Sequence, residues 1–344
     1  MKLSQFKYTL PKNLIAKAPK EPRDACKLMV VNKETGELLN KKFKNVIDYM
    51  EEGDALVLND TKVFSARLFG TKEKTKAKIE VFLLRQLDEV ENIWDVVVDP
   101  ARKVRIGNRI FFNKNLFCEV IDNTTSRGRI VRFNIKEDFK KYVEKIGKTP
   151  LPPYMRRDST DKDKELYQTV YSAHSGSVAA PSAGLHFTKE LLKKIEKKGV
   201  KVVYVTLHIG LGTFRLVEVE DLSKHRMDSE YYEITKDAAE KINQSIIKKK
   251  HVISVGTSVT RALESSVITG RFVRPGKGWT DKFIHPPNSV SVVHRLITNF
   301  HTAQSTHLML ACSLVERDIM MKAYKKAIKD KYKFLAYGDA LMII

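Results

Sequence analysis

The chain has 344 residues, of which 42% are hydrophobic and 9% aromatic, so it suits about two domains with sizeable cores and is too apolar for a disordered protein. Its 62 basic residues against 41 acidic ones give a formal net charge of +21, which favours a polyanionic partner, nucleic acid first, although lysine enrichment from genome composition produces the same excess. No apolar run reaches the roughly 18 residues that a transmembrane helix needs. With no signal peptide and three widely separated cysteines, Cys26, Cys118 and Cys312, we expect a cytoplasmic protein with buried thiols.

Short β-strands are predicted between Ala55 and Ile135. Segments rich in Val, Ile, Phe and Leu occur at 55–60, 77–87, 93–99, 109–112, 116–122 and 129–135. Turn-forming residues separate these segments, and no helical pattern lies between them. The spacing predicts a small barrel or sandwich.

Strands and helices alternate in the rest of the chain. A helical pattern covers 137–148, and the prolines of "TPLPPY" then interrupt regular structure. Predicted helices between Thr188 and Gly199 and at 305–318 alternate with predicted strands at 200–208 and 291–301, and 251–266 reads as strand, turn and helix. This order predicts an α/β main domain with an inserted small all-β, barrel-like domain. We place the boundaries at 1–62 with 148–344 for the main domain and 63–147 for the insert.

Three histidines, His186, His208 and His301, lie near predicted strand ends beside Gly, Ser or Thr. Ligands bind beyond the carboxyl ends of strands in α/β sheets, so these histidines are candidates for proton transfer around a substrate. A zinc site is one alternative, although no cysteine or carboxylate pattern completes it. Structural, hydrogen-bonded histidines are the other.

Two glycine segments also follow strands. Gly210 and Gly212 permit backbone N–H groups to face a ligand. Gly256 precedes a helix beginning at Thr257, whose N-terminus can hold a carboxylate, unless it is an ordinary capped turn. Glu264 lies on the same helix and is a candidate for tuning proton transfer, with surface salt bridging as the alternative.

The ordered motifs of the chain resemble S-adenosylmethionine:tRNA ribosyltransferase-isomerase, a family of queuosine biosynthesis. The resemblance covers essentially the whole chain and is carried by these segments, in order: "NDTKVFSARLFG", "LPPY", "YQTVYS", "VAAPSAGLHFT", "TLHIGLGTF", "HRMDSEYYEI", "VGTSVTRALES", "TNFH" and "AYGDALMI".

The resemblance implies transfer and isomerisation of the ribosyl moiety of S-adenosylmethionine onto 7-aminomethyl-7-deazaguanine in a tRNA anticodon, giving epoxyqueuosine-tRNA, adenine and methionine. S-adenosylmethionine is then a consumed substrate, and we expect no cofactor, no metal, no membrane association and a monomer. The expected catalytic residues are His186, His208, His301 and Glu264. The expected substrate-binding residues are Pro181, Ser182, Gly184, Gly210, Gly212, Thr213, Gly256, Thr257, Ser305 and Thr306. The expected tRNA-binding residues are Asn59, Asp60, Lys62 and Arg67.

The chain departs from the family pattern at several positions, mostly late in the sequence. It has "VGTSV" for "VGTTS", "FIHPP" for "FIYPG", and "TNFHTAQSTHLML" for "TNFHLPxSTLLML", with Ala303 in place of the proline. Lys62 replaces an arginine and loses bidentate capacity. These departures put the catalytic efficiency of the protein in question more than its membership of the family. The alternative hypothesis is a catalytically weakened, tRNA-binding paralogue, and a metal hydrolase using the three histidines is a third.

Overall fold

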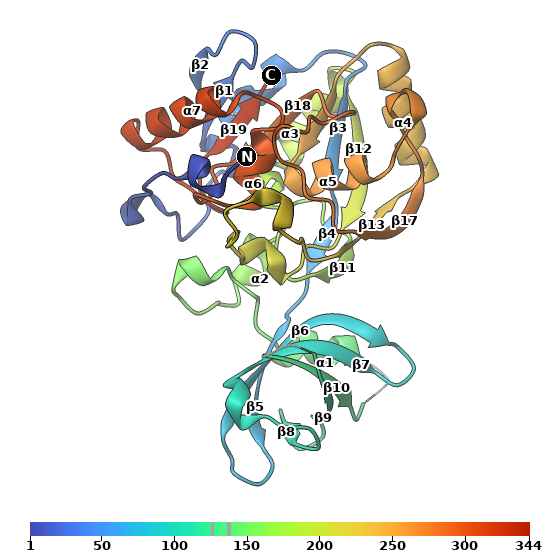
Figure 1. The fold of residues 1–344 in the computed structure, drawn as a ribbon. Helices are drawn as coiled ribbons and strands as arrows, with labels where there is room; N and C mark the ends of the chain where they lie inside the picture. The colour runs from blue at the N-terminus through green and yellow to red at the C-terminus, as the bar shows by residue number, and fades with distance from the viewer. Residues whose placement is uncertain (125–126, 136–138) are drawn as a thin grey trace. The chain divides into compact units, whose positions relative to one another are not determined.

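A computed structural model describes residues 1–124, 127–135 and 139–344 (Figure 1). The chain forms two compact units. The larger comprises Met1–Lys62, Pro153–Met155 and Gln168–Ile344, and the smaller comprises Val63–Pro152 and Arg156–Tyr167. Residues 148–152 and 156–167 therefore group with the smaller unit, whereas the sequence placed them in the main domain.

The larger unit is built on a nine-stranded mixed sheet (Figure 1). Its strands, in spatial order, are β17 (Gly276–Thr280), β13 (Glu230–Ile234), β12 (Lys201–Leu207), β3 (Ala55–Asn59), β14 (Val252–Val255), β18 (Arg295–Asn299), β19 (Ala340–Ile343), β1 (Lys27–Val31) and β2 (Leu38–Lys42). The four central strands β12, β3, β14 and β18 run parallel. Parallel strands buried on both faces need covering layers, and the continuous burial of β3 and β14 matches that requirement.

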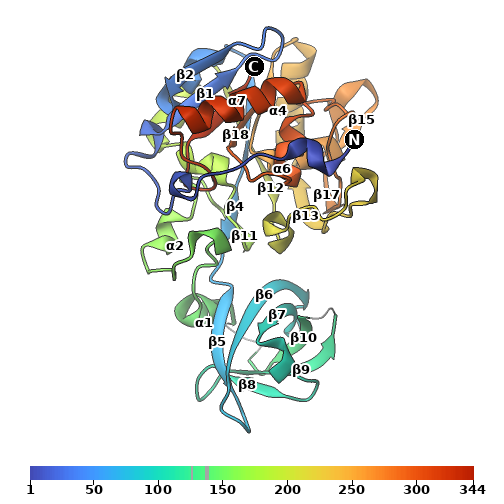
Figure 2. The same ribbon diagram turned by 60° about the vertical axis from the view of Figure 1, so that its left-hand side comes forward.

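Helices cover both faces of this sheet. One face packs against α3 (Lys189–Lys197), the 3-10 helix η4 (Phe43–Tyr49) and the 3-10 turn η7 (Ser182–His186). The other packs against α4 (Lys236–Ile247), α5 (Thr257–Ser265), α6 (Thr306–Ala311) and α7 (Arg317–Lys329). Figure 2 shows α7 lying across the sheet near β1. The α/β main domain is therefore confirmed.

The smaller unit contains a closed six-stranded barrel, in the order β10 (Gly128–Phe133), β7 (Ile93–Asp99), β6 (Lys78–Asp88), β5 (Arg67–Lys72), β8 (Arg109–Phe111) and β9 (Phe117–Asn123). All its pairings are antiparallel. Alternate side chains fill the interior, for example Val96, Val98 and Val120. Two short helices, α1 (Phe139–Ile146) and α2 (Asp163–Leu166), complete the unit. The predicted barrel-like insert is confirmed, whereas the predicted helix start at Glu137 lies outside the described residues.

Several elements differ from the sequence predictions. The helix predicted at 305–318 is two helices, α6 and α7, with a break between them. Strands β1, β2, β5, β13, β17 and β19 and helix α4 were not predicted. Two short pairs complete the structure, β4 (Thr61–Val63) with β11 (His174–Ser177) and β15 (Val267–Ile268) with β16 (Phe272–Val273).

The sheet topology brings distant segments to one edge. Because β3, β12, β14 and β18 are parallel, their carboxyl ends at Asn59, Leu207, Val255 and Asn299 lie at the same edge of the sheet. The segments that follow these strands carry most of the candidate site residues. The edge is therefore where a ligand site is expected.

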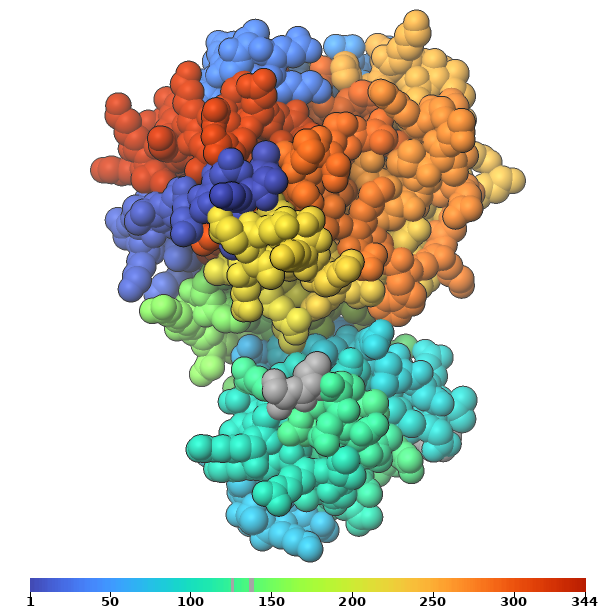
Figure 3. All heavy atoms as spheres, viewed as in Figure 1, coloured from blue at the N-terminus to red at the C-terminus, as the bar shows by residue number. Residues whose placement is uncertain are grey.

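The segment after β12 reaches the surface of the larger unit. It appears in yellow in Figure 3, beside the dark blue N-terminal residues. The contact is specific, since the Leu3 N–H donates to the Glu220 carbonyl at 2.9 Å and Ser4 bonds the Glu220 carboxylate.

Within the described ranges, no helix has the length and apolar character needed to cross a membrane.

Candidate active site

Asn59 connects three of the loops at the carboxyl edge. Its side-chain oxygen accepts from the backbone N–H groups of Thr61 and Leu207, both at 3.1 Å. Its side-chain nitrogen donates to the Leu207 carbonyl at 2.9 Å and to Ser258 Oγ at 3.2 Å. Asn59 is fully buried. It therefore joins β3, β12 and α5, and this position does not favour the tRNA contact predicted for it.

His208 is the candidate histidine best placed for proton transfer. Its Nδ1 lies 2.8 Å from Thr61 Oγ1, and that hydroxyl donates to the His174 carbonyl at 3.4 Å. When Thr61 gives its one proton to that carbonyl, its Oγ1 accepts from Nδ1–H, and the lone pair of the neutral ring is then on Nε2. Burial lowers the pKa of His208, with a further contribution from His174, so the ring is neutral at pH 7.

Gly176 keeps Nε2 of His208 accessible. A Cβ at this position would lie 2.6 Å from Nε2, so any side chain would cover it. Among the described residues, none bonds Nε2 of this half-buried ring. A general base needs a free lone pair, and this nitrogen meets the requirement.

His186, by contrast, is enclosed in the core. Its Nδ1 lies 3.2 Å from the Cys26 thiol, and its Nε2 lies 3.1 Å from the side-chain nitrogen of Asn299. The ring packs against Phe43 at 5.1 Å and is 4% exposed. Burial, with Arg23 as a second cause, lowers its pKa to about 4. With both nitrogens engaged, the geometry favours a structural histidine here, and its predicted catalytic role stays a prediction.

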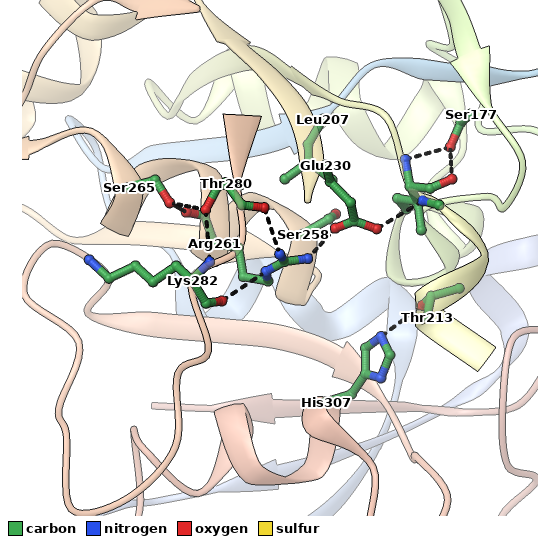
Figure 4. Close-up of polar contacts among 12 residues, drawn as sticks. Ser177, Leu207, Thr213, Glu230, Ser258, Arg261, Ser265, Thr280, Lys282 and His307 are labelled. Carbon is green, nitrogen blue, oxygen red and sulfur yellow. Dashed lines mark hydrogen bonds and ion pairs between the residues drawn. The ribbon is translucent and has the colours of Figure 1, made fainter. Parts of the chain in front are cut away.

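A second pair of histidines lies over the loop after β12. His301 Nε2 is 2.8 Å from Thr298 Oγ1, and its ring stacks on His307 at 5.1 Å. His307 Nε2 is 2.9 Å from Thr213 Oγ1 (Figure 4). Burial lowers the pKa of His307 to about 4 and that of His301 well below its ordinary value, so both rings are neutral.

A buried ion pair fixes the glycine segment beside these histidines. Arg261 of α5 pairs with Glu230 of β13, and the other carboxylate oxygen of Glu230 accepts from the Gly210 N–H at 2.8 Å (Figure 4). Arg261 also donates to the carbonyls of Lys282 and Thr280, both at 3.1 Å. Burial raises the pKa of the Glu230 carboxyl, and the positive charge of Arg261 partly offsets this rise. The pair therefore connects α5, β13 and the start of the "GLGTF" loop.

Glu264 has a structural position. Its carboxylate accepts from the backbone N–H groups of Ser291 at 2.9 Å, Val292 at 2.8 Å and Val293 at 3.4 Å. It is 4% exposed, and its own carbonyl accepts from Lys282. A carboxylate occupied by three amides holds the loop before β18. The geometry therefore does not favour proton transfer by Glu264.

The small-residue wall at 178–188 is tightly packed. A Cβ on Gly184 would lie 2.1 Å from the Tyr171 hydroxyl, so this glycine permits close packing of Tyr171. The buried Tyr171 hydroxyl and Asn299 Oδ1 have no hydrogen-bond partner within the described ranges. Pro181 is buried and Ser182 half-buried at the start of η7. The wall is thus densely packed, and two buried polar atoms beside it lack a protein partner within the described ranges.

The remaining substrate-binding candidates lie at turns and helix starts. Gly256 has a φ of +90° and opens α5, where Thr257 is half-buried. Ser305 caps α6 by accepting from the Leu308 N–H at 3.3 Å, and Thr306 follows it. A Cβ on Gly212 would lie 2.7 Å from Asp228 Oδ2. Gly256 and Thr257 directly follow the carboxyl end of β14, whereas the Ser305 hydroxyl is used in capping α6.

Of the tRNA-binding candidates in the larger unit, Lys62 alone is well exposed. Asp60 is 9% exposed and accepts from Thr206 Oγ1 at 2.7 Å, and burial raises its pKa. Arg67 lies in the smaller unit, where it faces Glu80 at 3.5 Å and the Phe82 ring. Asn59 and Asp60 are buried within the larger unit, which does not favour the tRNA contacts predicted for them.

Sequence reasoning missed His307 and the Glu230–Arg261 pair as parts of this edge. The departure from the family pattern at "STHLML" was a signal for His307, and Glu230 lies in the motif "HRMDSEYYEI", which gave no sign of its ion pair. Within 1–124, 127–135 and 139–344, no three His, Cys, Asp or Glu side chains are grouped so that they could hold a metal ion.

Comparison with known proteins gives consistent results over the full chain. The family model described as "Queuosine biosynthesis protein" matches residues 3–343. The chain is 56% identical over 346 residues to the S-adenosylmethionine:tRNA ribosyltransferase-isomerase of Chloroherpeton thalassium and 53% identical over 349 residues to that of Flavobacterium psychrophilum, with 100% of each chain covered. A crystal structure of an S-adenosylmethionine tRNA ribosyltransferase from Thermotoga maritima is 32% identical, with a TM-score of 0.56 over 99% of this chain and 100% of that one.

Proposed function

The chain belongs to the queuosine biosynthesis protein family, and from that premise we propose that it is an S-adenosylmethionine:tRNA ribosyltransferase-isomerase. It transfers the ribosyl moiety of S-adenosylmethionine to 7-aminomethyl-7-deazaguanine in a tRNA anticodon and releases adenine and methionine. The observation that carries the proposal is full-length identity of 48–56% to relatives of that name. A catalytically weakened paralogue is not favoured, because the similarity spans the whole chain.

The reaction needs a base beside the sulfonium of S-adenosylmethionine. A bond forms between the aminomethyl nitrogen and a ribosyl carbon, the bonds to adenine and to the methionine sulfur break, and a new bond within the ribosyl group closes the epoxide-bearing ring. The ribosyl group and the amine each lose one proton, of which one goes to departing adenine and the other to solvent. The positive sulfur acidifies the ribose C5′ protons, and a neutral imidazole can remove one of them. We assign this role to His208, since Thr61 fixes its tautomer and Gly176 leaves Nε2 accessible.

The loop at Gly210–Thr213 lies between His208 and the pair His301 and His307. Glu230 holds the Gly210 end and His307 holds the Thr213 end. We propose that this loop and the start of α5 at Gly256 surround S-adenosylmethionine, with the helix N-terminus near the methionine carboxylate. His301 and His307, both neutral, could assist departing adenine as hydrogen-bond donors through a ring N–H.

The wider setting follows from the sequence. S-adenosylmethionine is consumed as a substrate, and the proposal includes no further cofactor and no metal. Three buried, unpaired thiols at Cys26, Cys118 and Cys312 support a reducing compartment, the cytoplasm. The excess of 62 basic over 41 acidic residues supports tRNA as the partner. A monomeric state is part of the same proposal.

The test is incubation of the protein with S-adenosylmethionine and tRNA carrying 7-aminomethyl-7-deazaguanine, followed by nucleoside mass analysis and adenine measurement. Adenine and the epoxyqueuosine mass should appear together. The matched control is the same tRNA with guanine at that position, which lacks the nucleophilic amine. A chelator added to a parallel reaction should leave the rate unchanged. Absence of the product mass with the modified tRNA would refute the proposal.

A further inference from the structure

Three aromatic rings form a row across neighbouring strands at one end of the sheet. They belong to His208, which directly follows β12, to Tyr231 of β13 and to Trp279 of β17. The backbone N–H of His208 donates to the backbone carbonyl of Tyr231 at 2.9 Å. Tyr231 in turn lies directly opposite Trp279 in the antiparallel ladder. The ring centroids are 5.7 Å apart for His208 and Tyr231 and 5.8 Å apart for Tyr231 and Trp279. Directly opposed residues share a face, so the rings line one side of the sheet.

Exposure increases along this row. His208 and Tyr231 are half-buried, whereas Trp279 is 55% exposed on β17, the outermost strand of the sheet (Figure 1). The chain has two tryptophans, and the other, Trp94, is buried in the barrel. An indole ring buries a large apolar area and usually lies in a core, as Trp94 does. The exposed indole of Trp279 thus lies two ring contacts from the proposed base.

The segment around Trp279 is also basic. The segment 271–282 contains four basic residues, all exposed, against one acidic residue. They are Arg271, Arg274, Lys277 and Lys282, with Asp281 as the acidic residue. Lys277 lies on the same face as Trp279, two positions away along β17. Directly opposite Lys277 is Glu233 of β13, whose carboxylate accepts from the Tyr231 hydroxyl at 3.1 Å. Exposed aromatic rings beside cations are typical of surfaces that bind single-stranded nucleic acid, where bases stack on the rings and cations meet the phosphates.

We propose that the row His208–Tyr231–Trp279 is a stacking platform for an unpaired anticodon nucleotide of the tRNA substrate, adjacent to the nucleotide that reacts. The inference rests on the proposed function. A base that reacts inside a protein pocket has to leave the stacked loop, and its neighbour then loses a stacking partner. Trp279 and Tyr231 replace that partner, and the row ends at His208, where the reaction occurs.

The direct test uses the fluorescence of Trp279. In a Trp94→Phe variant, Trp279 is the sole tryptophan, and the conservative change lies within the barrel. Titration with tRNA carrying 7-aminomethyl-7-deazaguanine should quench its emission, because a stacked base lies in contact with the indole. Equal quenching by an anticodon stem-loop RNA of the same sequence is expected. Binding without any change in emission would overturn the proposal.

The second test is kinetic and does not depend on the fluorescent variant. Trp279→Ala should raise the KM for tRNA roughly tenfold, in line with the loss of one base–aromatic stack, and leave the KM for S-adenosylmethionine unchanged. Trp279→Phe should retain most of the affinity. The matched control is Ile247→Ala, which removes another exposed apolar side chain, at the end of α4.

The outcomes separate this inference from the proposed function. Normal KM values in Trp279→Ala, with turnover intact, overturn the platform and leave the enzyme activity standing. A wild-type protein that binds tRNA with quenching but forms no product overturns the activity and keeps the platform. If Trp279→Ala changes the oligomeric state of the protein in solution and leaves the KM for tRNA unchanged, the row is a contact between protein chains and the proposal is wrong.

Discussion

Replacing His208 with alanine tests the central assignment of the proposed mechanism. Loss of a positioned general base costs about 10²–10⁴-fold in rate, which corresponds to about 3–5 kcal/mol of activation free energy. The structural cost is smaller, since the half-buried ring gives up one hydrogen bond, to Thr61, worth about 1 kcal/mol. We therefore expect His208→Ala to fold and to bind S-adenosylmethionine while releasing adenine at least about 100-fold more slowly.

Two companion measurements make this prediction specific. Gly176→Ala places a methyl group 2.6 Å from Nε2 and should lower kcat with the imidazole still present. Because burial lowers the pKa of His208, its neutral form persists through pH 7, and activity should fall only as the pH drops below the ordinary histidine value of about 6.5. The assay is adenine release at saturating substrates between pH 5 and pH 8. A His208→Ala variant with normal kcat would show that the base lies elsewhere.

Four further predictions concern stability and binding. The native His186 has a pKa of about 4, below its unfolded value, so the unfolded state binds more protons between pH 6.5 and pH 4. His186 alone should therefore lower the free energy of unfolding by about 3 kcal/mol over that range, and this share of the fall should be missing in His186→Gln, as followed by urea titration. Glu264→Gln should lower the unfolding free energy by about 2 kcal/mol and leave the acid limb of the rate profile in place, whereas a lost limb would identify a catalytic carboxylate. Gly256→Val introduces a β-branched residue at a φ of +90° and should raise the KM for S-adenosylmethionine without weakening tRNA binding. Lys62→Ala should reduce the slope of log tRNA affinity against log salt by about one, and Arg67→Ala by less because Arg67 already has a carboxylate partner; equal effects would contradict the structure.

The barrel and the parallel centre of the sheet were predictable because their signal is local. Continuous or alternating apolar runs such as 93–99 and 252–255 fix their own secondary structure. Strand β2, with the sequence "LLNKK", is an exposed edge, and nothing in its composition marks it as a strand. Helix α4 had a usable signal in the sequence, Thr235 as N-cap before periodic apolar residues.

The site was predictable only as a region. Strand ends in parallel sheets meet at one edge, so residues after β3, β12, β14 and β18 could be grouped in advance. The accessibility of each ring depends on distant packing partners. His186 is enclosed by Cys26 and Asn299, which are 160 and 113 residues away in the chain, and His208 is left open by Gly176. Such contacts carry no signature in a single sequence.

The position of β19 has a consequence for how the protein forms during synthesis. This strand lies between β18 and β1, and it pairs with both. Strands β1 and β2 are made first, yet they join the rest of the sheet only after Ile343 has been added. At roughly 5–20 residues per second, more than 300 residues take about 15–60 s, during which the edge of β1 that faces β19 stays unpaired and open to aggregation. Strand β18 waits only for the short stretch between Asn299 and Ala340. A ribosome that stops before Ala340 therefore releases a chain whose barrel can close but whose catalytic sheet stays divided.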